Sequence, residues 1–155
     1  VGEGKGATLL QRDYSGDFLV WSGGQEGGGG LEKIAVYAGF GTHSGAGILV
    51  RARAVDAVGT IAGAVVLRDV TISGAGTWEY AAYLDGSERQ DCANACGVRI
   101  VRFDNVHLFQ ATVVSLLCDN CVAFEWFGGG AYGQAPGALF RGSLSQKNRI
   151  LADVP

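Results

Sequence analysis

Three segments of the chain share one spacing of apolar residues, and each begins 36 residues after the previous one. Each reads apolar-x-x-apolar-x-apolar, at Leu31–Val36, Leu67–Ile72 and Phe103–Leu108. The last two apolar positions of each copy lie two residues apart, which is the spacing of a strand face rather than of a helix. A fixed interval in this range is typical of stacked supersecondary units. The pattern therefore predicts an all-β solenoid.

The repeat also predicts which side chains meet in the core. We expect Ile34, Val70 and Val106 to stack in line across successive coils, because they occupy the same position of the template. A weaker fourth copy, Cys118–Ala123, follows the third after only 15 residues. The interval between copies is therefore expected to shorten there.

Glycine clusters separate the apolar runs. The 155 residues include 26 glycines, two prolines and no methionine, which fits short strands joined by tight turns. Strands are predicted at 8–11, 18–22, 31–37, 47–53, 65–73, 79–84, 98–109, 113–117, 122–127 and 139–141. Two or three strands per repeat is β-helix geometry, whereas the alternative, a β-sandwich, would show alternation without a fixed period. No glycine cluster reads as a linker, so residues 1–155 are interpreted as one domain.

Several short motifs resemble the pectate-lyase-like right-handed β-helix of bacteriophage tail spikes and tail fibres. They are Gly2–Leu10, Val70–Gly74 with Gly76–Trp78, Leu84–Ser87 and Glu125–Gly130. The resemblance covers most of the chain and implies a right-handed parallel β-helix that forms part of a homotrimer. It further implies a segment of a longer protein in the virion tail, which acts outside the host cell. The implied partners are bacterial surface polysaccharide, which such proteins bind and often cleave, and other tail proteins.

Charge and hydropathy exclude two classes of partner. The net charge is −3 and the basic residues are scattered, so nucleic acid is a poor candidate. No apolar stretch approaches the ~20 residues of a membrane span. Two small basic pairs, Arg51 with Arg53 and Arg99 with Arg102, fit either a solvated strand face or recognition of an anionic sugar.

The cysteines form two close pairs, Cys92 with Cys96 and Cys118 with Cys121. Buried thiols, disulfides that involve the first pair, and a structural zinc site all fit this spacing. The repeat places Cys118 and Cys121 at core positions. The resemblance to phage proteins also favours thiols, because it implies assembly in a reducing cytoplasm. We therefore predict buried thiols and neither a metal nor a cofactor.

The two histidines, His43 and His107, lie far apart and have no matched ligand residue nearby. His107 stands between Val106 and Leu108, which are predicted core residues, so its side chain is expected to point outward.

Several apolar side chains are also predicted to point outward: Tyr37, Phe109, Val122 and Phe124. A soluble monomer seldom exposes such a row to water, so we expect Phe109 and Phe124 at or near the subunit contacts of a homotrimer. A one-residue shift of the fourth copy is the alternative, and it would turn Val122, Phe124 and Trp126 inward and Cys121 outward.

Hydrolysis of a glycosidic bond needs two carboxyl groups about 5–9.5 Å apart on one surface. The candidate catalytic residues are Glu79, Asp85 and Glu125, because each lies near aromatic residues. The candidate sugar platforms are Trp78, Tyr80 and Trp126. The alternative is structural, since carboxylates after strands often bind turn backbone and tryptophan often fills a core.

Three functions fit this sequence: attachment to a host glycan, depolymerisation of that glycan, and a purely structural shaft. No acid/base pair is specified by spacing, whereas turn glycines and core residues explain nearly all of the pattern. We therefore expect binding without cleavage.

Overall fold

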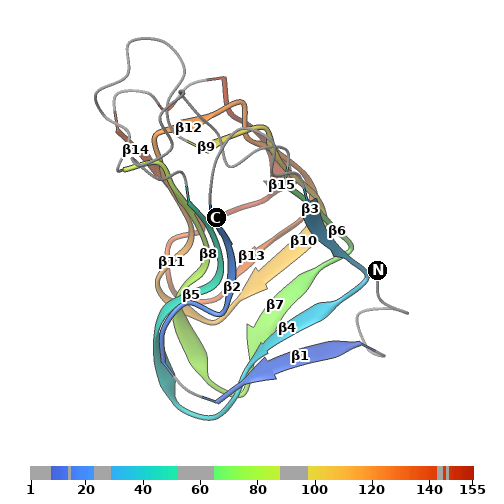
Figure 1. Ribbon diagram of the computed structural model, residues 1–155, viewed down its shortest axis with the longest axis vertical. Helices are drawn as coiled ribbons and strands as arrows, with labels where there is room; N and C mark the ends of the chain where they lie inside the picture. Colours follow the sequence, from blue (N-terminus) through green and yellow to red (C-terminus); the bar gives the residue numbers. More distant parts are fainter. Residues whose placement is uncertain are drawn as a thin grey trace.

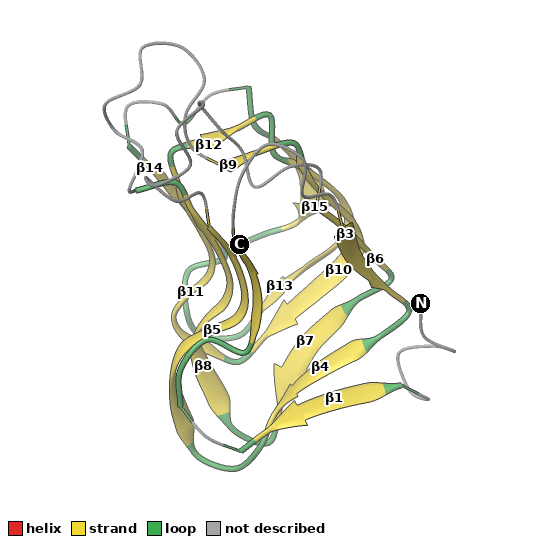
Figure 2. Ribbon diagram, in the orientation of Figure 1, coloured by secondary structure: helices red, strands yellow, loops and turns green. Residues whose placement is uncertain are grey.

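The computed structural model describes residues 8–13, 15–22, 29–51, 65–87, 98–142, 145 and 147–155. These residues form fifteen strands and no helix (Figure 2). Every strand pairing is parallel. The fold is therefore all-β with parallel sheets, as the sequence predicts.

The largest sheet follows the order β1 (Leu9–Arg12), β4 (Ala35–Ala38), β7 (Thr71–Gly74), β10 (Val101–Phe109), β13 (Glu125–Tyr132) and β15 (Arg149–Asp153). Two further strands, β3 (Gly29–Glu32) and β6 (Val65–Arg68), pair with each other, and β6 also pairs with β10. We call this sheet A.

A second sheet, sheet B, faces sheet A across the interior (Figure 1). Its order is β14 (Ala138–Arg141), β11 (Ala111–Asp119), β8 (Thr77–Asp85), β5 (Thr42–Arg51) and β2 (Leu19–Ser22). The short strands β9 (Val98–Arg99) and β12 (Cys121–Val122) form a third sheet. Along most of the chain each strand thus pairs with the strand three elements later.

The predicted register of the three copies is confirmed. Leu31 pairs with Leu67 and Leu67 with Phe103, while Val36 pairs with Ile72 and Ile72 with Leu108. Ile34, Val70 and Val106 lie between these paired positions, and all three are buried. The 36-residue interval therefore brings equivalent apolar residues of successive copies side by side.

A left-handed residue explains the spacing of the template. The third position of each copy is Lys33, Asp69 or Asn105, and their φ angles are 57°, 51° and 52°. A residue at such an angle interrupts the alternation of a strand, so apolar residues three apart can both face the core. Asparagine and aspartate accept this conformation more readily than most residues do.

The predicted fourth copy is wrong in its location. The strand that continues the register of Phe103 is β13, where Trp126 pairs with Phe103. Cys121 and Val122 instead form β12 and pair with Val98 and Arg99. The interval shortens because Asn120 alone links β11 to β12, whereas residues 86–97 link β8 to β9.

The expected exposure of Val122 and Phe124 is also wrong. Val122 is 7% exposed and Phe124 is 1% exposed, and Cys121 is buried beside them. The one-residue shift does not describe this segment either, because it would turn Cys121 outward. Asn120 and Ala123 have φ angles of 50° and 56°, so the alternation starts anew on each side of them.

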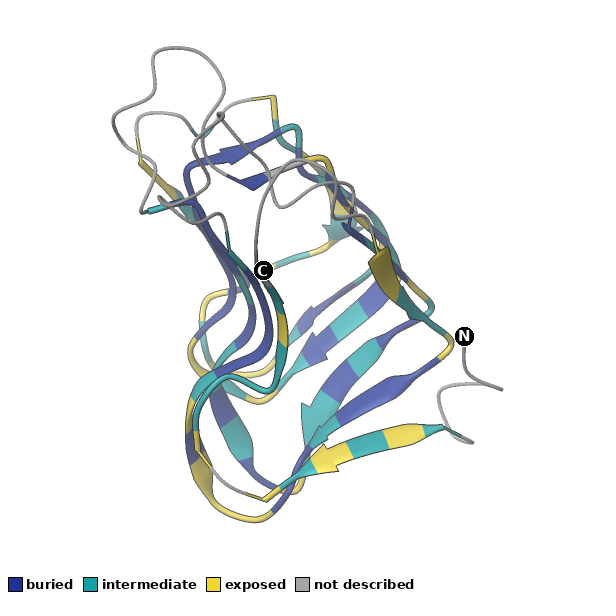
Figure 3. Ribbon diagram, viewed as in Figure 1, coloured by how far each residue is buried: buried dark blue, intermediate teal, exposed yellow. Residues whose placement is uncertain are grey.

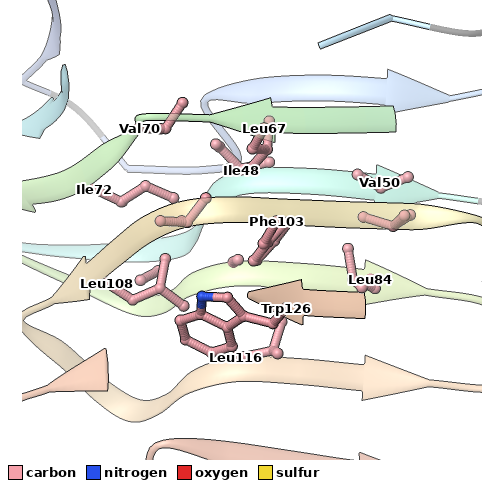
Figure 4. Packing of buried hydrophobic residues seen from close by; sticks show 14 of the residues in the cluster. Ile48, Val50, Leu67, Val70, Ile72, Leu84, Phe103, Leu108, Leu116 and Trp126 are labelled. Carbon is pink, nitrogen blue, oxygen red and sulfur yellow. The ribbon is translucent and has the colours of Figure 1, made fainter. Parts of the chain in front are cut away.

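The core lies between the sheets and takes side chains from both. Figure 4 shows Ile72, Phe103, Leu108 and Trp126 of sheet A pointing toward residues of sheet B such as Leu116. Buried and less buried positions alternate along β10, whereas β5 and β11 contain runs of consecutive buried residues (Figure 3). Burial of one face of each sheet provides the main stabilising contribution, as expected for apolar surface removed from water.

Candidate functional site

The three predicted catalytic carboxylates are not brought together. Glu79 and Asp85 both lie in β8, six residues apart, which is roughly 20 Å along a strand. Glu125 begins β13 in the other sheet, where its Oε2 lies 4.0 Å from Arg102 Nη1. Glu79 Oε2 accepts a hydrogen bond of 2.8 Å from the Gly45 backbone N–H. Gly45 lies at the irregularity of β5 between His43 and Ala46, so Glu79 has a structural role that binds strand backbone rather than a turn.

Two of the three predicted sugar platforms have no accessible ring. Trp78 and Trp126 are 0% exposed and belong to the core. A ring that is fully covered by protein offers no face to a sugar, so neither residue forms part of a surface site. Tyr80 is half-buried, and its ring lies 5.4 Å from that of Tyr83 on sheet B.

Asp85 belongs to a row of four charged residues across sheet B. Arg51 pairs with Asp85, Asp85 with Asp119, and Asp119 with Arg141 in strand register. We call this row the charged ladder. The two central carboxylates would repel each other, but each is held by a guanidinium: Arg51 Nε lies 2.8 Å from Asp85 Oδ2, and Arg141 Nη2 lies 2.7 Å from Asp119 Oδ2.

Hydrogen bonds complete the charged ladder. The Ser87 hydroxyl and backbone N–H donate to Asp85 Oδ1, and the Tyr83 hydroxyl donates to Asp119 Oδ2 at 2.7 Å. Burial alone would raise the pKa of Asp85, but the bonds from Ser87 and Arg51 lower it below its usual value. Burial and the bond to Asp119 raise the pKa of Tyr83. A glycosidase acid needs a raised carboxyl pKa, so Asp85 is unsuited to that role.

The partner of Asp85 was not identified from the sequence. Asp119 follows Asp85 by 34 residues, and the sheet B strands pair at this interval, as Ile48 with Ala82 and Ala82 with Leu116 show. The signal was present as Leu84-Asp85-Gly86 and Cys118-Asp119-Asn120. The apolar template repeats at 36 residues, so alignment at that interval does not place Asp119 opposite Asp85.

The charged ladder predicts acid-sensitive stability. The pKa of Asp85 is lower in the folded chain than in the unfolded chain, so its ionised form stabilises the fold above about pH 4 and this contribution is lost as the pH falls through the lowered pKa. We expect Asp85→Asn to reduce the free energy of unfolding at pH 7 by about 1.5–3 kcal/mol. Denaturant titrations at both pH values should show that the wild type and Asp85→Asn differ less in free energy of unfolding at pH 3 than at pH 7. The exposed Asp153→Asn is the control, and an equal loss at both pH values would contradict the prediction.

The predicted buried thiols are confirmed for one pair. Cys118 and Cys121 are free and buried, and burial raises the pKa of the Cys118 thiol well above its usual value. A buried thiol with a raised pKa is a poor nucleophile and a poor metal ligand. Cys92 and Cys96 lie outside the described residues, as do Arg53 and the side chain of Arg99.

Three rings on the outer face of sheet A lie nearly parallel to one another. His107, Phe109 and Tyr132 are half-buried, and we call them the aromatic strip. The Phe109 and Tyr132 centroids are 4.9 Å apart at an interplanar angle of 23°. The His107 ring lies 6.3 Å from Phe109 and 5.9 Å from Tyr132, at angles of 9° and 16°. The outward prediction for His107 is confirmed, whereas His43 is buried against Trp78.

Strand register and one glycine assemble the aromatic strip. β10 and β13 lie side by side (Figure 1), and Phe109 pairs with Tyr132 while His107 pairs with Gly130. A Cβ on Gly130 would lie 2.8 Å from the Tyr132 hydroxyl oxygen and 2.9 Å from Tyr132 Cζ. Gly130 therefore leaves room for the Tyr132 ring beside His107. The sequence drew attention to Phe109 and His107 but not to Tyr132, which is 23 residues from Phe109 rather than 36.

A pocket of about 590 Å³ adjoins the end of the aromatic strip. It lies where β10 and β13 leave sheet A, since Gln110 follows Phe109 and Gly133 follows Tyr132. We call it the corner pocket, and its lining includes Thr77, Gln110, Thr112, Gly133, Gln134 and Pro136. The strip and the pocket together form the candidate site.

Neither a metal cluster nor a spanning helix occurs in the part of the chain that the structure describes. No group of three or more histidine, cysteine, aspartate or glutamate side chains there could hold a metal ion. No helix there is long and apolar enough to cross a membrane. The chain matches no protein-family model, no curated protein and no solved structure.

Proposed function

We propose that this chain is a right-handed parallel β-helix segment of a bacteriophage tail spike or tail fibre, and that it binds bacterial surface polysaccharide on the aromatic strip. The observation that carries the proposal is the strip itself. Parallel, half-exposed rings on the outer face of a sheet offer apolar surface to the faces of sugars, and aromatic side chains dominate such contacts. The short motifs that resemble tail proteins support the choice of ligand.

The pairing of strands supports the β-helix. Successive members of both large sheets pair in parallel. The central pairings have intervals of 36 residues in sheet A and mainly 34 in sheet B, and the outer pairings have intervals of 22–29 residues, which describe coils that wind around one core. Parallel connections of this kind are right-handed in nearly all proteins. Trimeric association and a place in the virion tail belong to the same proposal. Phe124 is buried and contributes nothing to a subunit contact, and the proposal assigns Phe109 to sugar binding instead of to such a contact.

Binding without cleavage is the activity that the site favours. The catalytic candidates are separated, and Asp85 is engaged by Arg51 and Ser87. The described residues that line the corner pocket include no carboxylate. A general acid or base contributes about 10²–10⁴ in rate, so an acid/base pair would be readily detected.

The test is calorimetric titration with purified capsular polysaccharides and lipopolysaccharide O-chains. We expect Tyr132→Ala to weaken binding about 30-fold, the effect of losing a ring worth about 2 kcal/mol. Tyr80→Ala is the matched control, because Tyr80 is also a half-buried tyrosine with a neighbouring ring, that of Tyr83, but lies on sheet B. If Tyr80→Ala abolished binding and Tyr132→Ala left it unchanged, the binding site would lie on sheet B and the proposal would be wrong.

Reducing-sugar release is measured on the same ligands. We expect none from the wild type, and none from Glu79→Gln, Asp85→Asn or Glu125→Gln. Robust wild-type release that one of these substitutions abolishes would favour the depolymerase. An absence of binding to every polysaccharide would favour the structural shaft.

A further inference from the structure

The corner pocket has the size of a small-molecule site and a definite chemistry. Its volume of about 590 Å³ falls within the range of about 300–1,000 Å³ that is usual for such sites. The amides of Gln110 and Gln134 each offer donors and an acceptor. The Thr112 hydroxyl donates to the Trp78 backbone oxygen at 3.2 Å, which leaves its lone pairs as acceptors.

The charge of the lining restricts the ligand. None of the described residues that line the pocket is charged. An anionic sugar would lose water there without gaining a compensating charge, which is costly, whereas an uncharged sugar exchanges hydroxyl–water bonds for hydroxyl–amide bonds. Ala135 and Pro136 add apolar surface for the C–H face of a sugar ring.

The backbone connects the pocket directly to the rings. Gly133, which has a φ angle of 142°, links Tyr132 of the aromatic strip to the pocket residue Gln134, and its Cα lies close to the Gln110 backbone, since a Cβ there would be 3.7 Å from the Gln110 nitrogen. Because Gln110 and Gly133 directly follow Phe109 and Tyr132, a sugar chain that stacks on the aromatic strip can continue into the pocket.

We propose that the corner pocket binds one uncharged sugar unit of the polysaccharide that stacks on the aromatic strip. This inference rests on the proposed function and adds the class of sugar to it. Arg102 lies near the start of β10, at the end of that strand opposite the pocket. Arg68 of β6 pairs with Asp104 and Arg149 of β15 pairs with Glu125, so these two arginines lie near the same end of sheet A and outside the pocket.

The experiment uses the full chain and a set of purified bacterial polysaccharides, divided into uncharged ones and ones that contain uronic acid. We expect the wild type to bind uncharged members, and Gln134→Ala to weaken that binding about three- to tenfold, the effect of a lost hydrogen bond. Gln134 is exposed, so the variant should fold, and circular dichroism checks this. The control is Gln11→Ala, which removes another exposed glutamine, on β1.

The outcomes separate the two proposals. Binding that is restricted to uronic-acid polysaccharides would overturn the inference and leave the proposed function intact. Unchanged affinity of Gln134→Ala for uncharged polysaccharides would do the same. Failure of the wild type to bind any polysaccharide would overturn both.

Discussion

Phe103→Ala should lower the free energy of unfolding by about 3–5 kcal/mol, which is the usual effect of deleting a fully buried phenylalanine ring. Phe103 is 0% exposed and contacts two further rings in the core. Its centroid lies 5.1 Å from that of Phe124 and 5.7 Å from that of Trp126, both edge to face. Alanine would leave a cavity that the Trp126 ring cannot refill, because the pairing of β10 with β13 holds Trp126 in register. Denaturant unfolding followed by circular dichroism measures the loss.

Phe40→Ala is the matched control for this substitution. Phe40 is 88% exposed, so removal of the same ring should change the free energy of unfolding by no more than about 0.5 kcal/mol. If the two variants lost comparable free energy of unfolding, Phe103 would not belong to the core between sheets A and B. This comparison tests the repeat most directly, because Phe103 represents the third copy of the template.

Gly129→Ala should be far more harmful than Gly128→Ala, although the two glycines are neighbours in β13. Both have positive φ angles, 80° for Gly129 and 66° for Gly128, so each substitution costs about 1–2 kcal/mol in backbone strain. A Cβ on Gly129 would also lie 2.0 Å from the Val106 backbone oxygen. Relief of that clash requires β13 to move away from β10, so we expect a total loss of about 2–5 kcal/mol.

Gly128→Ala serves as the control, since the atom nearest to its Cβ would be Asn105 Cα at 3.8 Å. Thermal unfolding of the two variants gives the comparison. Equal losses would show that β10 and β13 are not in the close contact seen in the structure. A shift of β13 would also separate Tyr132 from Phe109, so Gly129→Ala is expected to weaken polysaccharide binding as well.

The strands that the sequence misses or misplaces have two physical causes. β15 was not predicted, since its Arg149–Asp153 segment carries one short apolar run and pairs only at the edge of sheet A. Leu31–Tyr37 was predicted as one strand but forms β3 and β4, because Lys33 has a φ angle of 57°. Propensity and alternation carry little information about a single left-handed residue, which tertiary pairing on both sides holds in place.

The candidate site shows the same limit. Spacing in the sequence brought Phe109 and His107 to attention, but it offered no reason to place Tyr132 beside them. Trp78 and Trp126 were attractive as platforms because tryptophan suits sugar faces, yet both serve the core. A side chain's type indicates what it can bind, whereas accessibility depends on the strand face it occupies.

The sequence by itself determined the all-β class, the 36-residue interval of sheet A and the burial of Ile34, Val70 and Val106, since periodic apolar positions must share one face. Only the tertiary structure decided the faces of Cys121 and Phe124, the pairing of Asp85 with Asp119 and the union of the aromatic strip with the corner pocket. These features depend on connection lengths and on left-handed residues between strands, which set the register of each coil against the next. If a connection were one residue longer or shorter, or a left-handed residue were moved by one position, an inward side chain would turn outward.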